Sequence, residues 1–276
     1  MSRNTAAVSV FTADRDEYFL FVKISFLGTG TSHGIPVIGC ACPVCLSPDP
    51  RNRRNRTGIW LSDPSGASVL LDVSSEFRIG ALRHGIADVD FVLLTHGHSD
   101  HISGLDDLRI FSQRGGRAMP IYCNSQTMAE VRGRYDYAFA PPREYGGGVP
   151  QYELREVTGP FAAGPWNVVP LPVLHGPDRI LGYRIGDFAF ITDVTVIPES
   201  TLDLMQGLEV LALDCLRPQP HSTHLSMPQA LDYALRIGAR RTFFVHMGHE
   251  LEHGEMERTL PADIRPAYDG LEVEIP

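Results

Sequence analysis

Three histidines and one aspartate fall within six residues of this chain, in the segment His96-Gly-His-Ser-Asp-His101. Imidazole and carboxylate groups are common protein ligands of zinc and related ions, and one tetrahedral ion cannot use all four groups from so short a segment. Histidines at positions i and i+2 can point to one side of a turned backbone, and the Asp-His pair that follows can reach a second ion. The segment therefore predicts two metal ions held close together.

Several short apolar runs of the chain are each followed by a residue of the metal-ligand type. Such runs are typical of buried strands. Helix-like stretches at residues 102–111, 126–134 and 227–237 separate some of them, which favours the α/β class. Strand ends in a layered sheet converge on one edge, so the residues after the runs are expected to lie together, although Asp72 and Asp214 fit equally well as turn caps. These residues are Asp72, His96, His175, Asp193, Asp214 and His246.

The charge and hydropathy of the 276 residues exclude some classes of protein. A net charge of −9 at pH 7 argues against a broad electrostatic grip on nucleic acid, which depends on Lys and Arg. No run reaches the roughly 18 apolar residues of a membrane helix. Charged residues occupy positions 14–17, where a signal peptide would be apolar. We expect a cytoplasmic protein with a small substrate, no membrane partner and no nucleic-acid partner.

Three of the five cysteines, Cys40, Cys42 and Cys45, are crowded into one segment, whereas Cys123 and Cys215 stand alone. An odd number of cysteines in a chain without an export signal argues against a disulfide framework. The three crowded thiols indicate a metal site, with three reduced thiols in a loop as the alternative.

The chain is expected to form one domain over residues 22–276, because the first convincing strand, VKISFLG, begins at Val22. Residues 1–21 would be a peripheral leader. Residues 133–160, which carry tyrosines and a glycine triplet, predict a long loop that is either a lid over the site or a surface excursion. The basic run of residues 51–56 fits a solvated loop or, alternatively, contacts to a substrate phosphate.

Ser226-Met-Pro-Gln229 has the form of a capping box, with Ser226 as the N-cap of the helix predicted at residues 227–237. His224 would then lie just before a helix N-terminus, a place that favours anions. His221 lies three residues earlier.

With its His-x-His-x-Asp-His motif directly after the buried run DFVLLT, the sequence resembles the metallo-β-lactamase superfamily over nearly the whole chain from Val22 onward. The resemblance implies a four-layer αββα sandwich. It also implies two divalent ions in the active site, manganese, zinc or iron. Asp193 would bridge the two ions, the first held also by His96, His98 and His175, and the second by Asp100, His101 and His246.

Cys40-Ala-Cys-Pro-Val-Cys45 and the pair His246-Met-Gly-His249 resemble the phosphoribosyl cyclic phosphodiesterases of the carbon-phosphorus lyase pathway. In that family a similar loop binds a structural zinc together with a histidine three residues beyond the last catalytic ligand. The resemblance implies such a zinc on the three cysteines and His249, with His253 as an alternative fourth ligand. It also implies a homodimer, and an active-site histidine at His224, with His221 as the alternative.

We therefore expect a phosphodiesterase that hydrolyses a small cyclic phosphate ester, either 5-phosphoribosyl 1,2-cyclic phosphate or a related nucleotide-like compound. A hydroxide between two metal ions would attack phosphorus, since bound water loses its proton near neutral pH. Asp100, Asp193 and His224 would be the catalytic residues, with His224 protonating the leaving oxygen. Two other hypotheses stay open: an RNA or nucleotide phosphodiesterase of the tRNA-processing type, and a non-hydrolytic cofactor-biosynthesis protein of the pyrroloquinoline quinone type.

Overall fold

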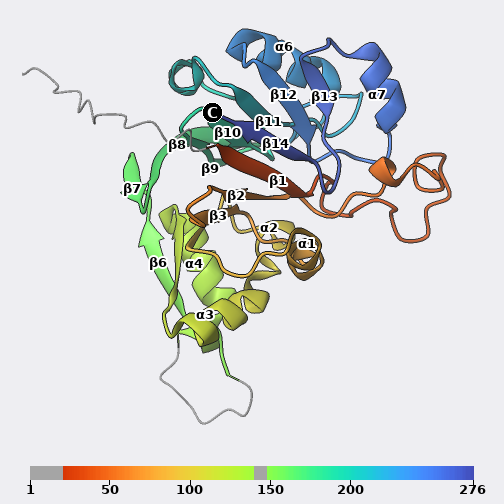
Figure 1. Cartoon of the computed structure of the whole chain (residues 1–276). Helices are drawn as coiled ribbons and strands as arrows, with labels where there is room; N and C mark the ends of the chain where they lie inside the picture. The colour runs from red at the N-terminus through yellow and green to blue at the C-terminus, as the bar shows by residue number, and fades with distance from the viewer. Residues whose placement is uncertain (1–20, 140–147) are drawn as a thin grey trace, which may run out of the picture.

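The computed structural model describes residues 21–139 and 148–276, and two seven-stranded sheets packed face to face form its centre (Figure 1). The first sheet contains β1 (Val22–Gly28), β2 (Gly58–Ser62), β3 (Ser68–Leu71), β4 (Phe91–Leu93), β5 (Met119–Cys123), β6 (Tyr152–Glu156) and β14 (Glu272–Ile275). The second contains β7 (Phe161–Ala163), β8 (Trp166–His175), β9 (Asp178–Ile185), β10 (Phe188–Ile191), β11 (Val210–Asp214), β12 (Arg241–Val245) and β13 (Ile264–Pro266).

The strand order places parallel strands where the sequence predicts metal-type residues. The first sheet runs β14-β1-β2-β3-β4-β5-β6, and the second runs β13-β12-β11-β10-β9-β8-β7. Strands β3 to β6 pair in parallel in the first sheet, and β10 to β13 do so in the second. The carboxyl ends of β3, β10, β11 and β12 therefore reach the same edge of their sheets. Asp72, Cys215 and His246 directly follow β3, β11 and β12, and Asp193 follows β10 after Thr192.

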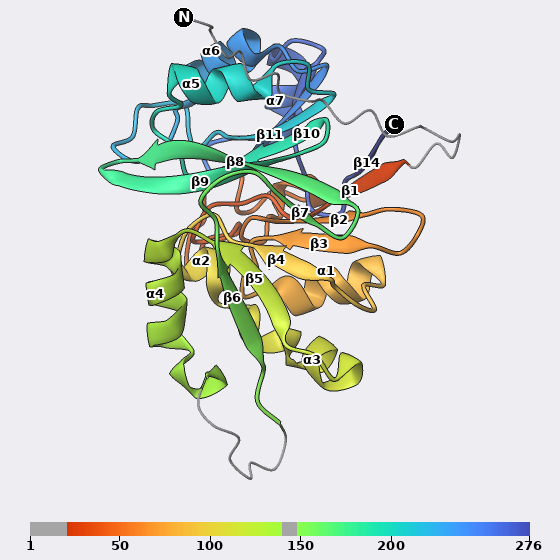
Figure 2. The ribbon, with the colours of Figure 1, turned by 90° about the vertical axis from the view of Figure 1, so that its left-hand side faces the viewer.

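Helices cover both outer faces of the sandwich. Against the first sheet lie α1 (Phe77–His84), α2 (Ser99–Ile102), η2 (Leu105–Leu108), α3 (Arg109–Gly115) and α4 (Ser125–Arg134), and against the second lie α5 (Glu199–Leu202), α6 (Met227–Ile237) and α7 (His253–Thr259). Figure 2 shows the resulting order of helices, sheet, sheet and helices from top to bottom. The predicted four-layer αββα sandwich is confirmed.

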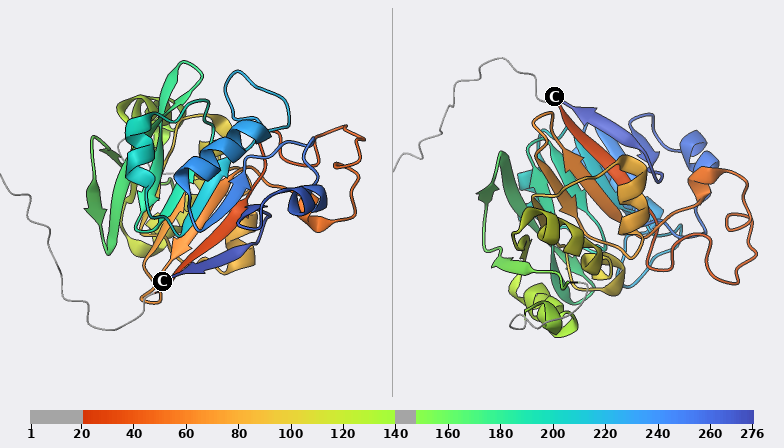
Figure 3. Two further views of the ribbon diagram at one scale, coloured as in Figure 1. Left: turned by 90° about the horizontal axis from the view of Figure 1, so that it is seen from above. Right: turned by 60° about the horizontal axis from the view of Figure 1, so that its bottom comes forward.

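Three apolar clusters hold these layers together. The central one packs the inner faces of both sheets, with Phe26 and Ile59 of the first sheet near Phe188 and Phe190 of the second. The other two pack the helices on their own sheets. Seen from above, the helices of the second sheet lie over its strands, and the loop of residues 35–52 extends beside α7 (Figure 3). Ion pairing of Arg51 with Glu257 of α7 joins this loop to the domain.

The helix expected at residues 102–111 is interrupted. Here α2 ends at Ile102 and α3 begins at Arg109, with the 3-10 turn η2 between them. The backbone N–H of Gly104 donates to the carbonyl of Val73, and a Cβ on Gly104 would lie only 2.0 Å from the carbonyl oxygen of Ser74. This close approach to the turn after β3 prevents a continuous helix, which an apolar pattern alone does not reveal.

The long loop expected at residues 133–160 is also interrupted, since Tyr152–Glu156 forms strand β6 and pairs in parallel with β5. A short 3-10 turn, η3, covers Asp136–Ala138. Residues 140–147 of the predicted lid lie outside the described residues, as do residues 1–20 of the predicted leader. Among the described helices, none has the length and apolar character needed to cross a membrane.

Candidate metal centre

Three residues just after the ends of strands have a left-handed backbone. Asp72, Asp193 and His246 have φ angles of 58°, 54° and 57°, a region that residues other than glycine rarely adopt. They follow β3, β10 and β12. Such a conformation costs about 1–3 kcal/mol and persists only where the surrounding structure enforces it. The backbone is therefore strained at all three positions, where a polar side chain lies near the end of a strand at the edge of the sandwich.

The seven residues predicted as ligands of the two active-site ions form two groups of four. One consists of His96, His98, His175 and Asp193, and the other of Asp100, His101, Asp193 and His246. Within each group, the potential ligand atoms all lie within 4.8 Å of one another. Asp193 belongs to both groups, which is the geometry of a bridging carboxylate.

Hydrogen bonds behind the cluster orient its imidazole rings. His101 donates from Nδ1 to Oδ2 of Asp72 at 2.7 Å, and His175 donates from Nδ1 to the carbonyl of Thr223 at 2.8 Å. The Nε2 atom of His101 then lies 3.2 Å from Asp100 and 3.1 Å from Asp193. Partners of this kind fix the tautomer and the direction of a metal-binding histidine.

The cluster is electrostatically suited to a cation. Burial opposes the ionisation of Asp193, but His246 and His101 hold the pKa of its carboxyl well below the usual range. Burial, with the neighbouring His101, lowers the pKa of His96 well below its ordinary value. Asp193 is thus ionised and His96 is neutral, the protonation states in which a carboxylate and an imidazole bind metal.

The donor atoms of the cluster also fit the size of a metal ion. Within the described part of the chain, Nε2 of His101 and both ring nitrogens of His246 are buried without a hydrogen-bond partner, which costs roughly 1–3 kcal/mol for each atom. Nε2 of His246 lies 3.5 Å from Asp100 and 3.4 Å from Asp193. Ligand atoms about 2.0–2.1 Å from one tetrahedral ion are about 3.3–3.4 Å apart. A divalent cation between these atoms would satisfy Nε2 of His101 and Nε2 of His246, while Nδ1 of His246 faces Asp214.

His224 lies at the edge of the cluster. Its ring stacks on that of His246, with centroids 4.8 Å apart and an interplanar angle of 12°. Its Nδ1 is 3.6 Å from Oδ1 of Asp214 and 3.8 Å from Oδ1 of Asp193. The ring of His221 is 5.1 Å from that of His224 but belongs to neither group of four. Of the two candidate active-site histidines, His224 is the one in contact with the predicted metal ligands.

Asp214, which the sequence leaves open between a turn cap and a site residue, is fully buried beside His246. Its Oδ1 lies 3.5 Å from Nδ1 of His246, and its Oδ2 accepts the backbone N–H of Leu225 at 2.9 Å. The same carboxylate therefore contacts a predicted metal ligand and anchors the residue next to His224.

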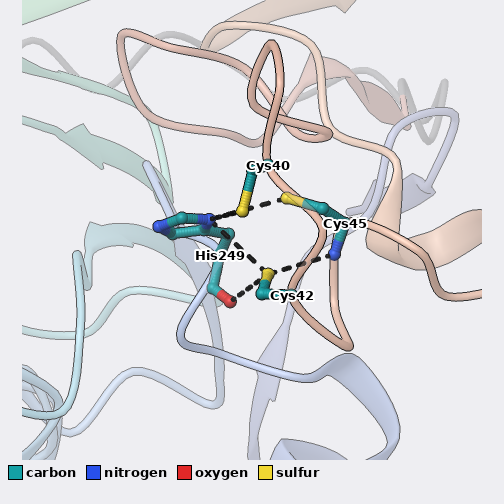
Figure 4. A group of neighbouring side chains, drawn as sticks. All are labelled: Cys40, Cys42, Cys45 and His249. Atoms are coloured by element: carbon teal, nitrogen blue, oxygen red, sulfur yellow. Dashed lines mark hydrogen bonds between the residues drawn. The ribbon is translucent and has the colours of Figure 1, made fainter.

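Cys40, Cys42, Cys45 and His249 form a separate group (Figure 4). Nδ1 of His249 lies 3.3, 3.6 and 3.5 Å from the sulfurs of Cys40, Cys42 and Cys45. Zinc bonds of about 2.3 Å to sulfur and 2.0–2.1 Å to nitrogen would separate these atoms by about 3.5–3.6 Å. The alternative fourth ligand, His253, packs instead against Tyr268. The four residues therefore fit one tetrahedral zinc ion.

The thiols of this group differ in their acidity. The backbone N–H of Cys45 lowers the pKa of Cys42 to about 7, while burial raises the pKa of Cys45 to about 11. An N–H bond to sulfur stabilises the thiolate, which is the form that binds metal. Cys42 therefore supplies a thiolate more readily than Cys45 does.

Arg54 is a structural residue that the sequence does not single out from the basic run of residues 51–56. It is fully buried, and it donates to the carbonyls of Gly248 and Leu251 at 2.9 and 2.8 Å. Burial lowers the pKa of its guanidinium to about 10. Arg54 thus fixes both sides of the turn that carries His249. It is neither the solvated residue nor the phosphate contact considered from the sequence.

Comparison with known proteins gives the family of this chain. A family model, described as a beta-lactamase superfamily domain, matches residues 64–247. A curated octanoyltransferase from Porphyromonas gingivalis is 37% identical over 258 residues, which are 92% of this chain and 52% of that protein. The chain thus spans about half the length of this relative.

Solved structures agree with the family model. The crystal structure of a diphosphatase from the PhnP family is 39% identical, with a TM-score of 0.86 over 92% of this chain and 97% of that one. Zinc-bound PqqB from Methylobacterium extorquens (18% identity, TM-score 0.71, 92% and 100% covered) and human tRNase Z, short form (15%, 0.67, 92% and 99%), share the fold. The chain therefore belongs to the beta-lactamase superfamily and, within it, to the PhnP family.

Proposed function

We propose that this protein is a dinuclear metal-dependent hydrolase of small phosphate esters. The observation that carries the proposal is the pair of four-residue groups that share Asp193, with His224 at their edge. The similarity to a PhnP-family diphosphatase supports phosphate chemistry. A cavity of about 420 Å³ lies beside His224, a size suited to a small molecule. We also propose that residues 22–276 form a single domain and that the protein is cytoplasmic.

The residues of the two groups would hold one divalent ion each, with Asp193 shared. Bound there, two ions would neutralise charge on phosphoryl oxygens and lower the pKa of water. Asp72 holds the ring of His101 in place, and Thr223 does the same for His175. His224 turns Nδ1 toward the carboxylates of Asp193 and Asp214, and its ring lines the cavity. It would donate a proton to the leaving oxygen there.

The cysteine group would hold a structural zinc. A complete set of three thiols and one imidazole leaves no position for substrate, so such an ion joins chain segments and does no chemistry. Here it would join the loop of residues 40–45 to the turn after β12, which Arg54 fixes from within. The turn also carries His246, so this zinc would support the catalytic cluster from outside.

The substrate we propose is a cyclic phosphate ester of a small sugar, such as 5-phosphoribosyl 1,2-cyclic phosphate. A strained ring favours attack at phosphorus, and the cavity beside His224 has room for a sugar phosphate. A small diphosphate is the second candidate, because the similar PhnP-family structure is that of a diphosphatase. Both substrates place a phosphorus atom at the cluster and need a proton donor for the leaving oxygen.

The test is hydrolysis by protein whose metal content has been measured. We expect about three ions per chain, turnover of 5-phosphoribosyl 1,2-cyclic phosphate, and a loss of about 100-fold or more in kcat on His224→Ala. His84→Gln is the control, because His84 is hydrogen-bonded to Glu272 and belongs to neither group of four. Cleavage of a nucleoside diphosphate alone would select the second candidate. A single zinc per chain and no turnover of either substrate would contradict the proposal and favour a non-hydrolytic protein.

A further inference from the structure

A cavity of about 370 Å³ lies between the two sheets, on the side of the sandwich where the chain passes from β13 to β14. Strand β14 is an edge strand of the first sheet, and β13 is an edge strand of the second. Residues of both strands and of the adjacent β12 line the cavity. Its volume falls in the range of about 300–1,000 Å³ that is typical of small-molecule sites.

The cavity is far from the metal cluster. Arg241, the first residue of β12, lines the cavity, whereas His246 of the cluster directly follows the last residue of the same strand. At about 3.3 Å per residue of extended backbone, these two positions lie roughly 16 Å apart. A small ligand of this cavity would therefore contact neither group of four metal-type residues.

Two arginines occupy positions on the inner face of the second sheet, which a sandwich normally fills with apolar residues. Successive side chains of a strand point to opposite faces, and Phe243 of β12 belongs to the central cluster between the sheets. Arg241, two residues earlier, therefore lies on the same inner face. Arg265 of β13 is the partner of Phe243 in the sheet register, so it shares that face. Two positive charges thus lie where the apolar core would otherwise continue.

Backbone carbonyls hold both guanidinium groups in place. Nη2 of Arg241 donates to the carbonyl of Glu274 at 2.8 Å, a bond that spans the gap between β12 and β14. Nε of Arg265 donates to the carbonyl of Ala262 at 3.3 Å. Among the ion pairs between described residues, none includes Arg241 or Arg265, whereas the neighbouring Arg240 has a carboxylate partner. Both positive charges are therefore available to a carboxylate or phosphate, whose oxygens match the geometry of a guanidinium.

Two carboxylates line the same cavity, and a nearby cation compensates one of them. Oε1 of Glu272 lies 3.2 Å from Nζ of Lys23 and 3.0 Å from Nδ1 of His84. Asp263 is exposed, and no ion pair between described residues includes it. The two arginines therefore face one uncompensated carboxylate, which leaves a net positive charge in the cavity and favours an anion.

The rest of the cavity wall is largely apolar. The side chains of Phe243 and Val273 are buried, and Leu271 packs against the central cluster. An inorganic anion would contact the arginines and leave this wall in water. A ligand that also carries an apolar body would cover the wall, which is favourable because burial removes apolar surface from water.

We propose that this cavity binds a small amphipathic anion, with a carboxylate or phosphate head between Arg241 and Arg265 and an apolar body against Phe243 and Leu271. The inference goes beyond the proposed function and does not depend on it, because no residue of the metal cluster takes part. The fold would then carry a second ligand site, on the side of the sandwich formed by β12, β13 and β14.

Direct binding tests this inference. The probes are hexanoate and hexyl phosphate, measured by isothermal titration calorimetry on the metal-loaded protein, so that the two titrations identify the preferred head group. Arg265→Gln should weaken binding by about 10- to 100-fold, the range for a lost charge-assisted hydrogen bond. Arg265→Lys should restore part of the affinity. Arg114→Gln, which removes an exposed charge at the end of α3, is the matched control and should change nothing.

Three further titrations give results that damage to the fold cannot produce. Asp263→Asn should tighten the binding of both probes by about 2- to 5-fold, because it removes the uncompensated negative charge. Acetate, which has the carboxylate head without the chain, should bind the wild type at least about 10-fold more weakly than hexanoate. Hexylammonium, which has the chain with the opposite charge, should not bind.

Three outcomes would overturn the inference. The first is that neither hexanoate nor hexyl phosphate binds the wild type. The second is equal probe affinity in Arg265→Gln and the wild type, which is the result expected if the probes bind at the metal cluster instead. The third is equal affinity for acetate and hexanoate, since the apolar wall would then take no part in binding.

Discussion

The two metal-type clusters of this protein are built in different ways. Cys40, Cys42 and Cys45 come from one loop, and their histidine comes from a turn that Arg54 holds from behind. The cluster around Asp193 comes from the ends of strands in both sheets, and it includes two residues with a left-handed backbone. Apart from His249, the residues of the first cluster are close together in the sequence. The second cluster exists only when the two sheets are packed together.

The difference extends to the surroundings of the ligands. Behind the second cluster lie the buried carboxylates of Asp72 and Asp214, which face His101 and His246. The sulfurs of the first cluster contact backbone N–H groups instead, such as those of Val37 and Cys45. Charged partners raise the basicity of a ligand and tune a reactive ion, while N–H groups stabilise thiolates at a static one. We therefore infer that the cluster around Asp193 carries out the chemistry and that the cysteine cluster stabilises the fold. Four substitutions test this inference.

The largest effect is expected from Asp193→Asn, which removes the negative charge that both groups of four in the cluster around Asp193 share. We predict a loss of at least about 1,000-fold in kcat/KM, because the Lewis-acid contribution of the ions is worth several kcal/mol. The melting temperature should change little by comparison. Steady-state kinetics with metal analysis measures this, with the exposed Asp187→Asn as control. Full activity in Asp193→Asn would remove the basis for a shared site.

The opposite pattern is expected from Cys42→Ser. Loss of the structural ion should lower the free energy of unfolding by about 3 kcal/mol, which lowers the melting temperature by roughly 6–12 °C. The protein should lose one ion per chain and keep the other two. Differential scanning calorimetry and metal analysis measure the two effects. Cys123→Ala, which removes a buried thiol outside the cluster, should leave the metal content unchanged. A Cys42→Ser protein with unaltered metal content would break the comparison.

A smaller effect is expected from Asp72→Asn. An amide cannot match the charge of the carboxylate that accepts from Nδ1 of His101, so we predict a 10- to 100-fold decrease in activity or in affinity for the second ion. Metal titration of the depleted protein measures the affinity. Asp232→Asn, on the exposed face of α6, serves as control. If Asp72→Asn lowered only the melting temperature, the carboxylate would be a structural cap and not a partner of the metal ligand.

The smallest effect is expected from Ser226→Ala at the start of α6. The structure contains the predicted capping box, in which the backbone N–H of Ser226 donates to Oε1 of Gln229 at 3.0 Å. Loss of the serine side chain should cost about 1 kcal/mol of stability. Chemical denaturation measures it, with exposed Ser200→Ala as control. A large loss of activity without a loss of stability would show that the cap mainly positions His224, two residues earlier, and would tie α6 to the catalytic cluster.

Much of the fold was predictable from local patterns. The apolar runs at residues 69–71, 91–94, 168–174, 188–191, 210–213 and 242–245 lie within or overlap six strands of the two sheets. The helix at 227–237 has the predicted bounds because its cap is encoded in four adjacent residues. The break before α3 and the edge strand β6 were not predictable, since both depend on contacts with segments far away in the sequence.

The candidate site shows the same division. The sequence favours His224 over His221 through the helix N-terminus beside it, and the stacking of His224 on His246 adds a contact that no local pattern reports. Arg54 looks like any other member of a basic run, and its burial follows from the path of the chain beneath residues 248–251.

The sequence by itself determined the donor types, their spacing in the motif at residues 96–101, and their positions after apolar strands, because ligand chemistry and strand periodicity are local properties. The tertiary structure alone decided which donors meet. Asp72 reaches His101, Asp214 reaches His246, and Arg241 faces a cavity because strand order and sheet packing bring distant segments together. A short-range pattern cannot encode these pairings, since each depends on the register of whole strands.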